Sequence, residues 1–134
     1  MAGLDIISYN CRGLPKSRQQ LALRPDIVNL MNSYQIVAFQ EIWYSKQNLN
    51  IINSLHDDFD GVGVAKIDEG DNIVHGRYSG GVAIMWRKEL RKFIKRIVFD
   101  VDWCIAIEIS IDNTKFIIFN IYMPYQSPDN ICPT

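Results

Sequence analysis

The order of apolar and polar residues in the first third of the chain predicts a strand, a helix and a second strand. Residues Leu4 to Asn10 alternate and are rich in Ile and Tyr, which is typical of a strand. Pro25 suits a first helical position, and apolar residues then recur at helical spacing through PDIVNLMNSY. Ile36 to Phe39 is a β-branched and aromatic run, which predicts the second strand. These segments predict a βαβ unit.

Beyond this unit the pattern becomes almost entirely β. Ser45 is suited to cap a second helix, and GVGVA predicts a strand that leads into a polar, glycine-bearing loop over residues 66–80. Four further strands are predicted in GVAIMW, RIVFDV, WCIAIEISI and KFIIFNIYM, with Asp112 and Asn113 as a hairpin turn. VAIMW and FIIFNIYM are apolar at nearly every position. This predicts burial on both faces, as in a layered α/β protein with a mixed sheet.

Composition narrows the class of protein. The 134 residues are 48% hydrophobic and 22% charged, which predicts one domain over 1–134 with a real core. A net charge of −1 gives no global field for a polyanion, so any nucleic-acid contact must come from a local basic patch. The three cysteines have no metal-ligand spacing, and reduced thiols in an intracellular protein are expected. The sequence predicts neither export nor membrane insertion.

Two polar residues end the predicted parallel strands. Asn10 is the residue at the end of the first strand, and Glu41 is the residue at the end of the second. Because a right-handed crossover brings both carboxyl ends to one edge of the sheet, this amide and carboxylate are expected in one small volume. One carboxylate with water and substrate phosphate is sufficient for Mg²⁺, so the pair is a candidate metal site. The alternative is an asparagine that turns the chain and a solvated glutamate.

Other candidate residues each have a structural alternative. Tyr122 ends the last predicted strand, where its phenol can donate to a phosphate oxygen or simply line the rim of the core. The run from Arg87 to Arg96 can contact a DNA backbone or form a solvated connector. Arg77 in the long loop can do the same or only solubilise the surface. The candidate DNA contacts are Arg77, Arg87, Lys88, Arg91, Lys92 and Lys95.

Four ordered blocks carry a family resemblance: ISYNCRGL, IVAFQEIWYS, YSGGVAIMWR and FNIYMPY. Together they resemble the N-terminal part of the endonuclease/exonuclease/phosphatase family, which is DNase-I-like. Within that family they are most similar to the endonuclease domain of non-LTR (LINE-type) retrotransposons, itself similar to apurinic/apyrimidinic endonucleases. The resemblance implies part of a four-layer α/β sandwich with mixed β-sheet, truncated before the second sheet is complete. It also implies a nuclear, Mg²⁺-dependent hydrolase of DNA phosphodiesters, with Mn²⁺ as a possible substitute.

The resemblance also assigns roles to single residues. Asn10 matches the family's asparagine beside the metal and scissile phosphate, and Glu41 matches its magnesium-binding glutamate. Tyr122 matches the tyrosine that contacts the phosphate. Tyr125 departs from the family, because many relatives have asparagine there, and this puts a substrate contact in doubt. The family's later Asp-x-Asn and Ser-Asp-His blocks, which orient the water and supply the catalytic histidine, do not occur in these 134 residues.

Three hypotheses follow from the sequence. The first is the metal-binding N-terminal portion of a retrotransposon-type DNA-nicking endonuclease. The second is a non-catalytic truncated or domesticated remnant that acts as a nucleic-acid or protein interaction fragment. The third, a phosphatase of small phosphoesters from the same superfamily, lacks support from NCRG and SGGVAI. A truncated sandwich is also expected to leave an apolar sheet face uncovered, which favours self-association.

Overall fold

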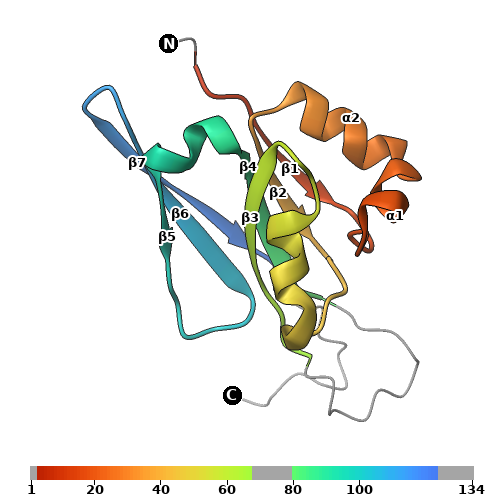
Figure 1. Cartoon of the computed structure of the whole chain (residues 1–134). Coiled ribbons are helices and arrows are strands. Elements are labelled where there is room, and N and C mark those ends of the chain that lie inside the picture. The colour runs from red at the N-terminus through yellow and green to blue at the C-terminus, as the bar shows by residue number, and fades with distance from the viewer. Residues whose placement is uncertain (1–2, 68–79, 124–134) are drawn as a thin grey trace.

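A computed structural model describes residues 3–67 and 80–123 of the chain (Figure 1). Two α-helices and two 3₁₀ helices are present in this part: α1 (Arg18–Ala22), α2 (Pro25–Ser33), η1 (Lys46–Ser54) and η2 (Lys88–Phe93). The strands are β1 (Ile6–Asn10), β2 (Ile36–Gln40), β3 (Phe59–Val64), β4 (Val82–Arg87), β5 (Ile94–Ile97), β6 (Cys104–Ile111) and β7 (Thr114–Ile121).

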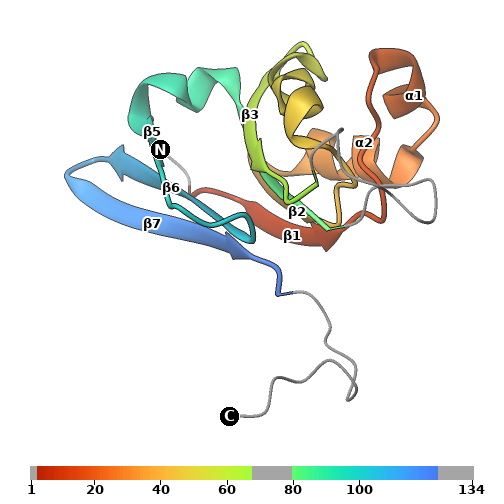
Figure 2. The ribbon, with the colours of Figure 1, turned by 90° about the horizontal axis from the view of Figure 1, so that it is seen from below.

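The strands form two sheets that pack face to face (Figure 2). The first has the order β1-β2-β4-β3, with β1 and β2 parallel and the other pairs antiparallel. The second is antiparallel, with the order β5-β6-β7. A core that includes Ile36, Ile84 and Ile107, all fully buried, fills the space between the sheets. The predicted class, part of an α/β sandwich with a mixed sheet, is confirmed.

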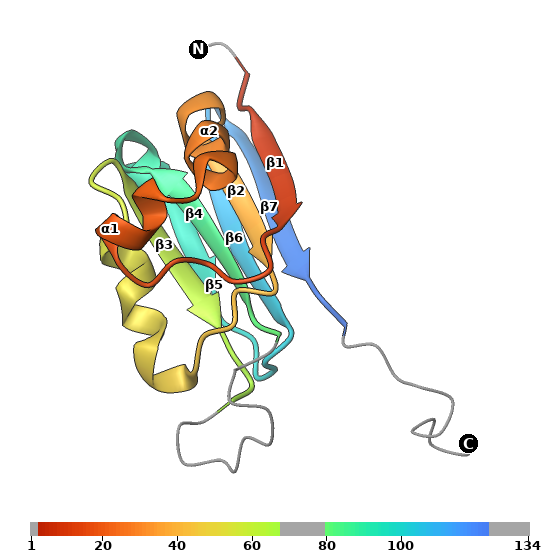
Figure 3. The same cartoon turned by 90° about the vertical axis from the view of Figure 1, so that its right-hand side faces the viewer.

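Helices α1, α2 and η1 cover the other face of the first sheet (Figures 2 and 3). Helix α2 begins with Pro25 in its first turn, as predicted, and its Ile27 and Met31 lie four residues apart and are both fully buried. The short helix α1 was not predicted; Ser17 caps it by accepting a hydrogen bond from the Gln20 backbone at 3.1 Å. The described residues therefore form three layers: helices, mixed sheet, antiparallel sheet.

Two predicted elements differ from the structure. The strand predicted in RIVFDV ends at Ile97, so the segment 98–101 lies outside β5, and Val98 is 79% exposed. An apolar run alone does not make a strand when no neighbouring strand remains to pair with it. The helix after Ser45 is a 3₁₀ helix, and the Ser45 side chain gives it no capping hydrogen bond. Its Asn- and Ile-rich sequence has weak α-helical propensity, in line with this tighter winding.

The prediction of burial on both faces holds for β4 and is wrong for β7. Every residue from Val82 to Trp86 is buried. On β7, Ile117, Phe119 and Ile121 are 46%, 54% and 50% exposed, because no described element covers the outer side of the second sheet. These three side chains are called the outer apolar face below. The hairpin turn into β7 is confirmed by the positive φ of Asp112 and Asn113, 52° and 63°.

Two of the three cysteines lie among the described residues. Cys11 and Cys104 are free and buried, while Cys132 lies outside the described residues. Burial raises the pKa of the Cys11 thiol to about 12, and its Sγ donates to the backbone oxygen of Gln40 at 3.3 Å. This thiol therefore stays protonated at neutral pH. Among the described residues no helix is long and apolar enough to cross a bilayer.

Candidate functional site

Asn10 and Glu41 lie at the end of the first sheet where the parallel strands β1 and β2 finish. The parallel register pairs Asn10 with Gln40, the residue before Glu41. The pairing continues past the strands, because the Cys11 backbone N–H donates to the Gln40 oxygen at 3.0 Å. The two candidate ligands thus leave neighbouring strands side by side. Asn10 is exposed and Glu41 is half-buried, so both are open to solvent.

The backbone at Glu41 adopts a left-handed conformation, with φ at 54°. Such a conformation costs about 1 kcal/mol or more in a non-glycine residue and persists only where neighbours impose it. The Glu41 carbonyl oxygen accepts from Gly13 at 2.7 Å, and the next amide, that of Ile42, donates to the Gly81 oxygen at 3.3 Å. Gly81 has φ at 86°, and an added Cβ would lie 2.7 Å from Cγ1 of Ile42. These contacts turn Glu41 out of the strand direction.

Tyr122 reaches the same place from the second sheet. Its backbone N–H donates to the Trp103 oxygen at 3.0 Å, which prolongs the pairing of β6 and β7 by one residue. Burial raises the pKa of Tyr122, and the charge of the Glu41 carboxylate and a hydrogen bond to it raise the pKa further. The phenol therefore lies near the Glu41 carboxylate, although the two residues come from different sheets. No spacing in the sequence could have placed these two residues together.

A guanidinium supports the turn that follows Asn10. Arg24 donates through Nη1 to the Gly13 oxygen and through Nη2 to the Cys11 oxygen, each at 2.8 Å. The same guanidinium binds Asp26 through both carboxylate oxygens, at 3.1 and 3.0 Å. Tyr9 adds a hydrogen bond to Asp26 Oδ2 at 2.7 Å. This network fixes a turn in which Gly13 has φ at 102°, and it lies under a hollow of about 500 Å³ beside Asn10.

Asn120 and Gln40 form a buried link directly behind these residues. The Gln40 Nε2 donates to Asn120 Oδ1 at 2.8 Å and to Ser8 Oγ at 3.0 Å. The Asn120 Nδ2 donates to the carbonyl oxygens of Phe39 and Ala83, at 3.0 and 2.7 Å. Asn120 is not among the candidate site residues predicted from the sequence. The one signal for it was an amide inside the otherwise apolar run FIIFNI.

Comparisons with known proteins assign the chain to a family. The model of the endonuclease/exonuclease/phosphatase family matches residues 7–133. The chain belongs to this family. AP endonuclease LMAP from Leishmania major is similar over 89% of this chain and 40% of its own, with 12% identity and a TM-score of 0.64. TDP2 from D. rerio, solved with a single strand DNA product, is similar over 89% of this chain and 45% of its own, with 16% identity and a TM-score of 0.50.

Similarity at this level of identity shows the fold of the endonuclease/exonuclease/phosphatase family and no more. The chain spans less than half the length of either solved structure. A search of curated proteins found no significant match. The relationship to LINE-type retrotransposons therefore depends on the four sequence blocks alone.

The donors at the candidate site suit the divalent cation that this family implies. Glu41 supplies a carboxylate, and Asn10, at the end of the neighbouring strand, carries an amide oxygen. Mg²⁺ prefers such oxygen ligands and is commonly held by only one or two carboxylates, with water and substrate completing its shell. Within residues 3–67 and 80–123, no group of three or more His, Cys, Asp or Glu could hold a metal. The donor set fits a substrate-completed Mg²⁺ site better than a closed protein cage.

The predicted DNA-contacting residues are placed elsewhere. Strand β4 runs antiparallel to β2, with Trp86 paired to Ile36. The basic run that follows β4 therefore begins at the end of the sheet opposite to Glu41. Arg87 donates to the Met31 oxygen at 2.8 Å, and Arg91 binds Asp60. The ammonium of Lys92 lies over the ring of Phe93, while Lys88 and Lys95 are exposed. Arg77 and Tyr125 lie outside the described residues.

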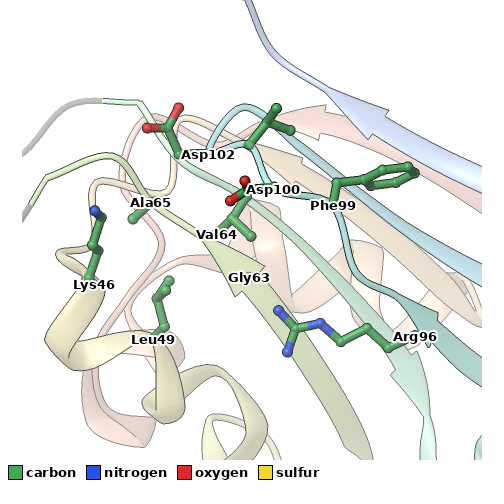
Figure 4. Close-up of a pocket in the computed structure, with 10 residues that line it drawn as sticks. Lys46, Leu49, Gly63, Val64, Ala65, Arg96, Phe99, Asp100 and Asp102 are labelled. Carbon is green, nitrogen blue, oxygen red and sulfur yellow. The ribbon is translucent and has the colours of Figure 1, made fainter.

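A second hollow, of about 440 Å³, lies between η1, the end of β3 and the segment after β5 (Figure 4). Since Val64 pairs with Val82, and Val82 with Gln40, it opens at the same end of the first sheet as Glu41. Its charged lining residues are Lys46, Arg96, Asp100 and Asp102. The mixture of signs gives no preference for an anion or a cation. This hollow contributes nothing to the candidate site.

Proposed function

We propose that this chain is the metal-binding portion of a Mg²⁺-dependent phosphodiesterase that acts on DNA, as the nicking endonuclease of a non-LTR retrotransposon does. The observation that carries the proposal is that Asn10 and Glu41 leave neighbouring parallel strands at the same end, with Tyr122 of the second sheet near Glu41. Membership of the family supports the reaction class. The blocks NCRG and SGGVAI support the retrotransposon origin, and DNA as partner follows from it.

Each residue has a distinct task in this proposal. Glu41 and the amide oxygen of Asn10 hold Mg²⁺, for which Mn²⁺ can substitute. A cation held there would supply positive charge to a phosphodiester oxygen on which negative charge develops. Tyr122, whose raised pKa keeps its phenol protonated at neutral pH, donates a hydrogen bond to a phosphate oxygen. The protonated phenol and the amide thus orient the phosphodiester, while the carboxylate compensates the charge of the cation.

The alternative is a remnant without catalysis. In this chain no family block supplies the general base, because the Asp-x-Asn and Ser-Asp-His blocks do not occur in the 134 residues. A remnant of this kind retains the fold and can retain the metal site. Metal binding and DNA nicking must therefore be measured separately, because only nicking distinguishes a complete active site from a retained part of one.

The experiment is a titration of the 134-residue chain with Mg²⁺ and Mn²⁺ by calorimetry and by Mn²⁺-enhanced water relaxation. Glu41→Gln removes the carboxylate charge and is expected to abolish binding. The matched control is Glu108→Gln, because Glu108 lies on β6 and pairs with Lys115 at 3.3 Å, away from the site. The control is expected to bind like the wild type. Equal binding by Glu41→Gln would refute the proposed metal site.

A further inference from the structure

Asn120 is a buried polar residue in a strand that otherwise presents apolar side chains to the core. It is 3% exposed and faces the first sheet, while Ile118 packs in the same inter-sheet core. Burying an amide is unfavourable unless its donors and acceptor find partners. Here both donor contacts and the acceptor contact are made, and all three partners belong to the first sheet. One side chain of β7 therefore binds both β2 and β4.

The hydrogen bond between Gln40 and Asn120 lies next to the candidate metal site. Gln40, whose amide binds Asn120, directly precedes Glu41. Asn120 itself lies two residues before Tyr122, and alternate residues of a strand share a face, so both point toward the first sheet. The polar link thus joins the residue next to the carboxylate with the strand that carries the phenol. The hydrogen bond between Gln40 and Asn120 thus fixes the position of Glu41 relative to Tyr122.

An apolar residue would satisfy the packing requirement at this position without any polar partner. Its strand neighbours Ile105 and Ile118 lie in a core made of Ile, Val and Trp side chains. Satisfied buried polar contacts are directional, whereas apolar packing allows one sheet to slide on the other. The amide therefore specifies the register between the sheets at the point where Glu41 turns out of β2.

We propose that Asn120 is a positioning residue, which holds the strand end that carries Tyr122 beside Glu41 by binding Gln40 and the two carbonyl oxygens across the sheet interface. It is buried and is not itself one of the proposed ligands of the metal or the phosphate. The consequence for metal affinity rests on the proposed function, whereas the consequence for the geometry of Glu41 and Tyr122 does not. Residues that orient metal ligands in this way typically change affinity by about 10- to 100-fold when replaced.

Two variants test the link from its two ends. Asn120→Leu is nearly isosteric and removes all three hydrogen bonds, and Gln40→Met removes the partner amide while leaving β7 unchanged. The first readout is the nuclear Overhauser effect between the Tyr122 ring and the Glu41 side chain. The second is the affinity for Mg²⁺ and Mn²⁺. In both variants we expect the Overhauser effect to disappear and metal binding to weaken by about 10- to 100-fold, with Asn120→Thr recovering part of each.

The control is Ile107→Ala, which opens a cavity in the same core, at a fully buried position without polar contacts. It is expected to lower the unfolding temperature and to retain both the Overhauser effect and the affinity. If Asn120→Leu fails to fold, Gln40→Met carries the same test. Persistence of the Tyr122–Glu41 Overhauser effect in a folded Gln40→Met or Asn120→Leu variant would overturn the proposal. Absence of metal binding by the wild type would instead overturn the proposed function, and the Overhauser effect would still decide the role of Asn120.

Discussion

Arg91 binds Asp60 through two parallel hydrogen bonds, Nε to Oδ2 at 2.6 Å and Nη2 to Oδ1 at 2.8 Å. Asp60 is buried in β3, and Arg91 comes from η2, the segment that leads from the first sheet to the second. A guanidinium engaged in this way has little freedom to meet a phosphate. Arg91 of the basic run therefore attaches η2, the connection between the two sheets, to β3.

We expect Arg91→Ala to destabilise the fold in a pH-dependent manner. The hydrogen bond from Arg91 lowers the pKa of Asp60 in the folded state, so the pair contributes stability above the unfolded pKa of that carboxyl and loses it as the pH falls through the folded pKa. Urea unfolding at neutral pH should show a lower midpoint for the variant. In acid the two midpoints should converge. A difference that persists unchanged in acid would contradict this explanation.

The Arg24–Asp26 pair should show the same dependence more clearly. Arg24, and then Tyr9, lower the pKa of Asp26 from its usual value to about 2. Asp26→Asn is expected to cost about 1 kcal/mol at neutral pH, a value discounted for solvent screening because the carboxylate is more than a third exposed. The cost should vanish between the usual carboxyl pKa and about pH 2. Asp57→Asn, at an exposed ion pair with Arg18, is the control and should change little.

DNA binding, if electrostatic, should depend on the exposed lysines. Replacing Lys88, Lys92 and Lys95 with glutamine should weaken binding and reduce the slope of log affinity against log salt by about 0.9 for each phosphate that is no longer neutralised. Fluorescence anisotropy with a labelled duplex at several salt concentrations measures both quantities. Arg91 is left intact because it binds Asp60. An unchanged slope would show that the footprint lies elsewhere, for instance at the exposed Arg12 beside Asn10.

The outer apolar face should drive self-association. Ile117, Phe119 and Ile121 are half-exposed on β7, an edge strand with only Lys115 as a charge near its start. An exposed apolar face promotes association between copies, and so does an unpaired edge strand. Light scattering should show mass increasing with concentration, and Phe119→Thr with Ile117→Thr should suppress the increase. A monomeric wild type at high concentration would contradict this expectation.

The sequence predicted those parts of the molecule that depend on local pattern. The βαβ unit follows from the apolar spacing around Ile27 and Met31 and from the strand-end residues Asn10 and Glu41. The turn at Asp112 and Asn113 follows from their tolerance of positive φ. In each case the information lies within a few residues of the feature itself.

Other features depend on contacts between distant segments, and the sequence did not predict them. The hydrogen bond between Gln40 and Asn120 joins residues 80 positions apart. The apolar run around Phe119 is indistinguishable in composition from a strand that is buried on both faces. Only the arrangement of the two sheets determines that, among the described elements, none covers the outer side of β7.

The last prediction concerns catalysis itself. With Mg²⁺, the 134-residue chain should not nick supercoiled plasmid above background. Loss of a general base typically lowers a rate by about 10²- to 10⁴-fold, and the blocks that supply the base and orient the water in this family do not occur in the sequence. Glu41 and Tyr122 can hold and orient a phosphodiester, but neither can activate water: in the proposed site Glu41 holds the cation, and Tyr122, whose pKa is raised, is protonated at neutral pH. Plasmid relaxation is measured beside light scattering, with Glu41→Gln as the reference for contaminating nucleases. Nicking by a monomeric chain that disappears in Glu41→Gln would show that these residues already form a complete active site.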